Sequence, residues 1–416
     1  MNLAPLLVLL IAGAIAVPAF SNPLGATVVN GSAAISQSGN VLTVTNSNGA
    51  IINWNKFSIA AGETTHFSQP SASSSVLNRV MNDPTVIYGT LSSNGHVWLV
   101  NPSGIMIGPG GRIDTAGFVA STLHVRDEDF VAGRSLFVDG GSAGPVINQG
   151  EIRTPAGGRV YLIGANVTNQ GIITTPQGEA ILAAGATVSL SDTATPGVRV
   201  DITGSEGTST NLGLIAAEAG SIVMAGVNVR NSGFLEASNV NITSVQSVFV
   251  TGGGAITATG DVVINAGSDI TVNSEGTFSG GHNISIKGSA INMSSGSGSI
   301  YVTGGMIATN PSNLTLSGGG NIAGSSSGGS LRLARGSLAV ATETRKLLQQ
   351  TAGAISLRGA ASVQPVAPTP IAATATAPAP LRASTPTARL VNTGSLVDGA
   401  VTVRLSLVDA SPISLR

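Results

Sequence analysis

The side chains with which this chain could perform chemistry are few, and their spacing is irregular. The 416 residues contain no Cys and four widely separated histidines, His66, His96, His124 and His282. A structural zinc site needs Cys or His ligands in closely spaced sets. The sequence therefore predicts no zinc centre, and it offers no other cofactor site.

Carboxylates that could act as acid and base are also isolated. Hydrolysis of a sugar linkage usually needs two facing carboxyl groups, whereas Glu151, Glu179 and Glu218 are expected singly on turns. The run Asp127–Asp129 could supply calcium ligands, but a solvated acidic loop is the simpler interpretation. We therefore assign no catalytic residue or metal ligand and expect no enzyme activity. A carbohydrate-active β-helix enzyme is the alternative hypothesis.

One stretch has a defined local geometry. A strand-like apolar run ends at Val100, and strand residues resume after four turn-forming residues. Asn can bond its own backbone, Pro fixes φ, and Gly tolerates positive φ. The pattern predicts strand, tight turn and strand over Asn101, Pro102, Ser103, Gly104 and Ile105.

These elements belong to a repeat of about 21 residues. The triplet Asn148-Gln149-Gly150 recurs 21 residues later as Asn169-Gln170-Gly171. Apolar residues recur every 21 positions at Val160, Ile181, Ile202 and Val223, and every 22 positions at Ile242, Ile264 and Ile286, with Val240, Val262 and Ile284 beside them. Alternation of apolar residues within such a period is typical of a β-solenoid.

We therefore predict an all-β fold, a right-handed single-stranded parallel β-helix with an N-terminal β cap. Stacked coils would pair their backbones at ~4.8 Å per coil, and parallel crossovers are right-handed by default. One polar position also aligns, two residues before a recurrent Gly. We expect its side chains to form a structural Asn ladder at one turn, with a ligand-binding stripe as the alternative: Asn148, Asn169, Asn211 and Asn231.

Composition narrows the function classes. Charged residues make up 9% of the chain and aromatic residues 3%, and the net charge is −1. A nucleic-acid-binding protein would need a basic surface, so nucleic acid is not an expected partner. The absence of Cys fits a chain that crosses an envelope unfolded, since a periplasmic disulfide would obstruct threading.

The first 21 residues are predicted to be a secretory signal peptide. Their apolar run, Leu6 to Phe20, is too short to span a bilayer comfortably, and Ala19 and Ser21 place small residues at a cleavage site. No second segment is long and apolar enough for a membrane helix, so the mature chain is expected to have no integral membrane segment.

The turn and its neighbours resemble the secretion domain of filamentous haemagglutinin-like exoproteins of bacterial two-partner secretion (TPS). The resemblance covers residues 22–254 and is carried by Ile51–Ile59, Gly95–Leu99, the Asn101 turn and Ala120–Leu123. The family has Asn-Pro-Asn-Gly at this turn, so Ser103 departs from its pattern. The resemblance makes Asn101, Pro102, Ser103, Gly104 and Ile105 the candidate secretion motif, acting either by contacting the transporter or by shaping a turn.

The resemblance implies a protein that a Gram-negative bacterium exports through the periplasm to its surface or medium. Its partner would be an outer-membrane β-barrel transporter with periplasmic transport-associated domains. An adhesin or binding role toward a host-cell or glycan ligand is implied, with a structural surface or matrix protein as another alternative. After the secretion domain we expect a β-helix extension (255–335), a helical cap (336–355), a Pro/Ala/Thr-rich linker (356–389) and a tail (390–416).

Overall fold

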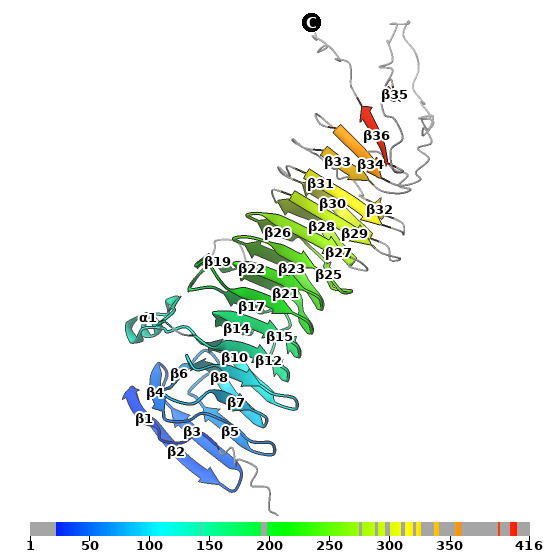
Figure 1. Ribbon diagram of the computed structural model, residues 1–416. Coiled ribbons are helices and arrows are strands. Elements are labelled where there is room, and N and C mark those ends of the chain that lie inside the picture. The colour runs from blue at the N-terminus through cyan, green and yellow to red at the C-terminus, as the bar shows by residue number, and fades with distance from the viewer. Residues whose placement is uncertain are drawn as a thin grey trace, which may run out of the picture.

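The computed structural model shows an elongated stack of β-coils (Figure 1). It describes residues 22–141, 143–192 and 198–273, and beyond them the strands at 277–287, 290–295, 300–308, 313–318, 322–325, 337–340, 354–358, 390–391 and 400–405. The expected signal peptide, residues 1–21, lies outside the described residues.

Two short antiparallel strands close the N-terminal end of the stack. They are β1 (Thr27–Asn30), which pairs with β4, and β2 (Ala33–Ser38), which pairs with β3. All other pairings of the first sheet are parallel, so within this sheet antiparallel pairing is confined to the cap. The fold thus has the β-solenoid architecture and the N-terminal cap that the sequence predicts.

Each coil contributes strands to two sheets, in which successive coils pair in parallel. The first sheet contains β3 (Val41–Asn46), β4 (Ala50–Trp54), β5 (Thr64–Ser68), β6 (Ser75–Val80), β8 (Thr90–Val100), β10 (Arg112–Ser121), β13 (Glu151–Arg153), β14 (Arg159–Gly164), β16 (Ile172–Thr174), β17 (Glu179–Ala184), β21 (Leu214–Gly226), β23 (Phe234–Ser244), β25 (Ala255–Ala258), β26 (Val262–Ala266), β28 (Thr277–Lys287), β30 (Ile300–Ala308) and β32 (Ile322–Ser325).

The second sheet faces the first across the core. It contains β7 (Thr85–Ile87), β9 (Ile105–Ile107), β12 (Pro145–Asn148), β15 (Asn166–Asn169), β20 (Thr208–Asn211), β22 (Asn228–Asn231), β24 (Val248–Val250), β27 (Asp269–Asn273), β29 (Ala290–Ser295), β31 (Asn313–Gly318), β33 (Ser337–Val340), β34 (Ala354–Arg358), β35 (Leu390–Val391) and β36 (Ala400–Leu405).

Aliphatic columns fill the interior between the sheets. Ile242 pairs with Ile264, and Ile264 with Ile286, so the 22-residue columns lie in register as predicted. Side chains of similar size stack on one another from coil to coil, which is how a solenoid buries a continuous core. Aromatic residues enlarge the core near the cap, where Phe57 lies between Trp54 and Phe67.

The 21-residue column was predicted with the wrong register. Val160 pairs with Ala180, and Ile181 instead pairs with Tyr161. Ile202 lies outside the coils, in β19. Val160 and Ile181 fall out of register because the step from Val160 to its partner Ala180 is 20 residues and not 21. Ile202 was misassigned because an excursion, β18 (Thr187–Asp192) and β19 (Val198–Thr203), occupies about one repeat, so the periodicity continues through a segment that is not a coil.

The excursion forms a small antiparallel sheet with β11 (Ser135–Val138), which follows the short helix α1 (Asp127–Val131). This outer sheet and α1 cover part of the outward face of the first sheet, over β8, β10, β14 and β17. Strands beneath it are apolar on both faces, as in β17, where every residue is buried. Continuous apolar runs are expected of strands covered on both sides.

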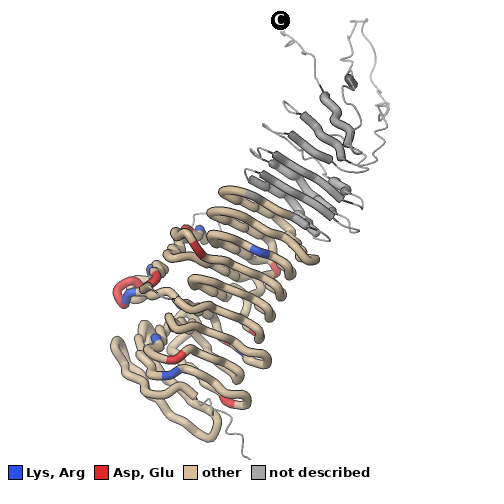
Figure 2. The backbone as a smooth tube through the Cα atoms, viewed as in Figure 1, with Lys and Arg blue, Asp and Glu red and all other residues tan. Residues whose placement is uncertain are grey.

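A second apolar core therefore lies outside the coils. Phe137 of β11 is fully buried and stacks on Trp98 of β8, with ring centroids 5.7 Å apart. Phe130 of α1 meets the same Trp98 edge-on at 5.3 Å. Figure 2 shows that charged residues are sparse along the stacked coils and gather around α1.

The C-terminal expectations are only partly covered. The helical cap expected over 336–355 is wrong at residues 337–340, which lie in β33; this strand pairs in parallel with β31 and continues the second sheet. Residues 341–353 and 359–389 lie outside the described residues. No helix in the described part of the chain combines the length and apolar character needed to cross a bilayer.

Truncation of Phe137 tests the outer core. We expect Phe137→Ala to lower the free energy of unfolding by about 3–5 kcal/mol, the usual cost of emptying a buried Phe site. Denaturant titration followed by Trp fluorescence would measure it. The control Val131→Ala, at a side chain 60% exposed, should change stability by less than about 0.5 kcal/mol; equal losses would contradict this account.

Candidate functional site

The Asn101 turn forms the corner where the chain leaves β8 in the first sheet and enters β9 in the second. Asn101, Gly104 and Ile105 are buried, Pro102 is half-buried and Ser103 is exposed. The backbone N–H of Gly104 donates to the carbonyl of Asn101 at 3.1 Å, and Gly104 has φ +123°. A side chain would be strained at that φ, so Gly is required here.

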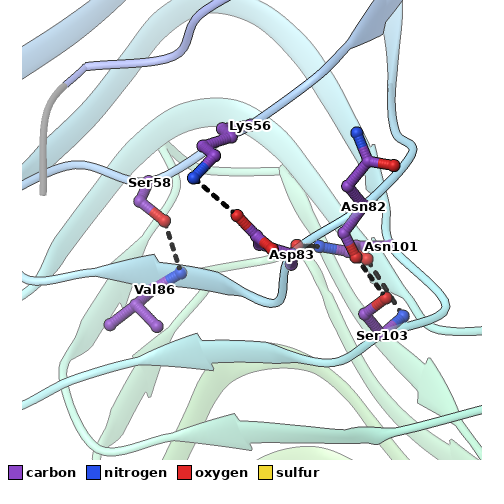
Figure 3. A network of polar contacts seen from close by, with 7 residues as sticks. All are labelled: Lys56, Ser58, Asn82, Asp83, Val86, Asn101 and Ser103. Carbon is purple, nitrogen blue, oxygen red and sulfur yellow. Dashed lines mark hydrogen bonds and ion pairs between the residues drawn. The ribbon is translucent and has the colours of Figure 1, made fainter.

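The Asn101 side chain uses all its hydrogen-bonding groups (Figure 3). Its Oδ1 accepts from the backbone N–H of Ser103 at 3.0 Å. Its Nδ2 donates to the carbonyl of Asp83 and to Oγ1 of Thr85, both at 2.9 Å. The first bond shapes the turn itself, while the other two hold the preceding coil.

Ser103 also forms a hydrogen bond to the preceding coil. Its hydroxyl donates to the carbonyl of Asn82 at 2.6 Å, across a separation of 21 residues, which is one coil. Pro102 is tied to the next coil, since its carbonyl accepts from Gly144 at 2.7 Å. The motif residues therefore link three successive coils at one corner.

Sequence reasoning missed the loop of residues 81–84, which the motif holds. This loop is exposed throughout, and Asp83 forms an ion pair of 2.8 Å with Lys56. The sequence contained two clues to this loop. Asn, Asp and Pro favour a turn, and Asn82 precedes Ser103 by one coil length. Only a correct assignment of the coil register would have connected the two.

The structure places the four aligned asparagines in one buried ladder. Asn148 Nδ2 donates to Asn169 Oδ1 at 2.7 Å, Asn169 to Asn211 at 2.9 Å, and Asn211 to Asn231 at 2.9 Å. All four side chains are fully buried. A ligand in solution has no access to these amides, and each bond joins one coil to the next.

A comparison with known protein families matches a region that includes the Asn101 corner. Residues 19–264, more than half of the 416-residue chain, match the family model of the TPS secretion domain. The chain belongs to the TPS secretion domain family. The matched region contains both the Asn101 corner and the Asn ladder.

Two heme/hemopexin-binding proteins of Haemophilus influenzae are similar to this TPS chain. One is 33% identical over 134 residues, which are 31% of this chain and 15% of that protein. The other is 38% identical over 74 residues, which are 18% of this chain and 8% of that protein. The matches thus span only a small part of these relatives' length.

A solved structure is similar over a larger share. The crystal structure of the HMW1 secretion domain from Haemophilus influenzae superposes with a TM-score of 0.57 at 27% identity. The match covers 77% of this chain and 87% of that structure. The β-solenoid of this TPS domain is therefore the fold of a known secretion domain.

The charged residues of this TPS domain are arranged differently from the sequence-based expectation. Glu151 lies in β13 and not on a turn, and its carboxylate is 2.8 Å from Arg153 and 3.9 Å from Arg112, which also pairs with Asp114 at 3.0 Å. Glu179 is not on an exposed turn. It is buried and accepts hydrogen bonds from Tyr161 and from the backbone of β19, so it fastens the excursion to the coils.

The acidic run is a helical turn and not a solvated loop. In α1, Asp127 pairs with Arg79 at 2.7 Å, and the buried Asp129 pairs with Arg134 at 2.7 Å. These carboxylates already have arginine partners. Within the described residues, no three His, Cys, Asp or Glu side chains gather as metal ligands.

Two histidines lie on the outward face of the first sheet. His66 Nδ1 is 2.9 Å from the hydroxyl of Ser92. His96 pairs in register with Gly117, where an added Cβ would meet the imidazole ring. Burial, and then the nearby Arg159, lower the pKa of His96, which favours the neutral imidazole.

The ladder can be tested against a matched exposed pair. We expect Asn169→Ala to cost about 1–3 kcal/mol of unfolding free energy, since Nδ2 of Asn148 loses its buried acceptor and Oδ1 of Asn211 loses its buried donor. The exposed Gln149–Gln170 contact has the same 2.7 Å length one position along. Gln170→Ala should cost less than about 0.5 kcal/mol, and thermal unfolding of both variants would show whether burial makes the difference.

The corner can be tested in the same way. We expect Asn101→Ala to lower unfolding free energy by about 2–4 kcal/mol, because three hydrogen bonds are lost and two partners stay under-satisfied. Ser103→Asn restores the family residue and should be nearly neutral. Chemical denaturation would measure both, and a neutral Asn101→Ala would refute the structural role of this side chain.

Proposed function

We propose that the chain is a secreted exoprotein whose N-terminal domain directs export through a dedicated outer-membrane β-barrel transporter with periplasmic transport-associated domains. The observation that carries the proposal is the Asn101 corner within a chain of the TPS secretion domain family. The corner ties three coils together at the candidate secretion motif.

Export would proceed in steps that the fold explains. A signal peptide delivers the chain to the periplasm, and the chain crosses the transporter unfolded. Each coil that emerges pairs its backbone with the coil before it and buries another layer of the aliphatic core. Because folding removes the unfolded chain from the equilibrium, it favours movement outward.

At the surface or in the medium, the exported protein would act as an adhesin or binding protein for a host-cell or glycan ligand. Support comes from relatives named as heme/hemopexin-binding proteins, although the matched region is 15% or less of their length. The carbohydrate-active alternative is less well supported, since Asp114 and Glu151 on the outward face are both paired with arginines.

Deletion of the transporter gene in the native bacterium tests the export route. We expect the mature chain to disappear from the medium and cell surface. Asn101→Ala should lower export at least tenfold with the transporter present, because the expected loss of about 2–4 kcal/mol from the corner exceeds the ~1.4 kcal/mol that shifts its formed-to-open ratio tenfold. Quantitative immunoblotting of medium, surface and periplasm would measure both.

Gln170→Ala is the control, since its side chain is exposed and far from the corner. Export that continues without the transporter would overturn the proposal. It would leave an ordinary secreted β-solenoid, for which a carbohydrate-active role would need to be tested.

A further inference from the structure

We propose that the transporter recognises an exposed patch beside the motif and that Asn101 positions this patch from beneath. The inference rests on the proposed function and names the surface by which it would operate. We call this surface the corner patch, and it comprises Leu24, Lys56, Met81, Asn82, Asp83 and Pro84, all of which are exposed.

Asn101 is poorly placed to contact a partner itself. Its side chain is fully buried, and its Oδ1 and Nδ2 are bonded to Ser103, Asp83 and Thr85. A partner that read this amide directly would have to open the corner. What the amide controls is the position of the backbone at Asp83, and Ser103 adds a bond to the carbonyl of Asn82.

Figure 3 shows the result: Asn101 and Ser103 lie on one side of the loop, and Lys56 reaches Asp83 from the other. The bonds to the motif use the loop's backbone carbonyls. The motif forms no hydrogen bond to the side chains of Asn82 and Asp83 through these contacts. It therefore fixes the position of the loop backbone while both side chains stay exposed.

The corner patch is continuous across three segments. The backbone N–H of Leu24 donates to the carbonyl of Lys56 at 2.9 Å, and that of Met81 donates to the carbonyl of Trp54 at 3.1 Å. The Lys56–Asp83 ion pair crosses between them at 2.8 Å. The N-terminal segment, the end of β4 and the loop after β6 therefore meet at one place.

The chemistry of the corner patch suits a protein partner. Leu24 is 50% exposed and Met81 59%, and both adjoin a charge pair whose side chains are 63% and 59% exposed. Apolar anchors next to charges that set orientation are the usual composition of a recognition surface. The occupant is taken to be the transporter because a TPS secretion domain implies such a partner and the patch adjoins the candidate secretion motif.

Two surface variants in the native bacterium test this inference. Leu24→Glu with Met81→Glu removes the apolar anchors. Lys56→Asp with Asp83→Lys keeps the ion pair, the net charge and the backbone carbonyl that Asn101 holds, but reverses the polarity. Each should lower export about tenfold or more, as expected for hot-spot residues, while the unfolding midpoint of the purified chain stays near wild type.

The matched control is Phe234→Glu with Val245→Glu, since these side chains are 53% and 49% exposed on distant coils. Control export at the wild-type level supports the proposal. Wild-type export of either patch variant overturns it, as does an equal loss in the control. Transporter dependence of the wild-type chain is scored separately, so the patch can fail while the export route stands.

A second copy of the chain is the competing occupant. Light scattering of the purified wild-type protein would detect self-association. A dimer that the Met81→Glu change abolishes, with export unchanged, would assign the patch to self-association and overturn recognition by the transporter.

Discussion

Every coil of this protein depends on parallel backbone pairing with the coils on either side. That pairing fixes the register of all side chains at once, because a strand displaced by one residue would exchange its core face for its outer face. The aliphatic columns, the Asn ladder and the Asn101 corner all follow from this constraint. Each consists of side chains that meet only because their backbones are already aligned.

The register also explains why polar groups can be buried so fully. The four ladder asparagines and Asn101 have no exposed surface, yet their amides have partners. A buried amide is tolerable when its partner is supplied by the adjacent coil at a fixed distance. Stacking thus offsets the free-energy cost of burying an amide and makes the side chain a link between coils. Asn101 likewise forms hydrogen bonds to a loop of the preceding coil.

The sequence was informative where one residue type repeated at one position. Ile242, Ile264 and Ile286 identified the coils correctly, and the Asn-Pro-Ser-Gly run identified a turn. It was misleading at Ile202, since an excursion of about one repeat leaves the period undisturbed while its residues lie outside the coils. The helical cap expected over 336–355 is wrong at residues 337–340, because local amphipathicity competes with pairing to an existing sheet edge.

In the candidate site, too, some features could be predicted from the sequence and others could not. The turn could be inferred from the preferences of four consecutive residues, which are local properties. The role of residues 81–84 could not, because it depends on which coil lies next to which. Likewise, nothing in Glu179 as a residue type indicates that it would be buried beneath β19.

The outer sheet has a consequence for the order of events along the chain. Its strand β11 pairs with β18, so Phe137 lies opposite Val188, and the two segments leave from different coils. In a chain that folds from its N-terminus, β11 therefore waits for its strand partner until the coils up to β17 have formed. Only then can β18 and β19 complete the outer sheet and close the second apolar core.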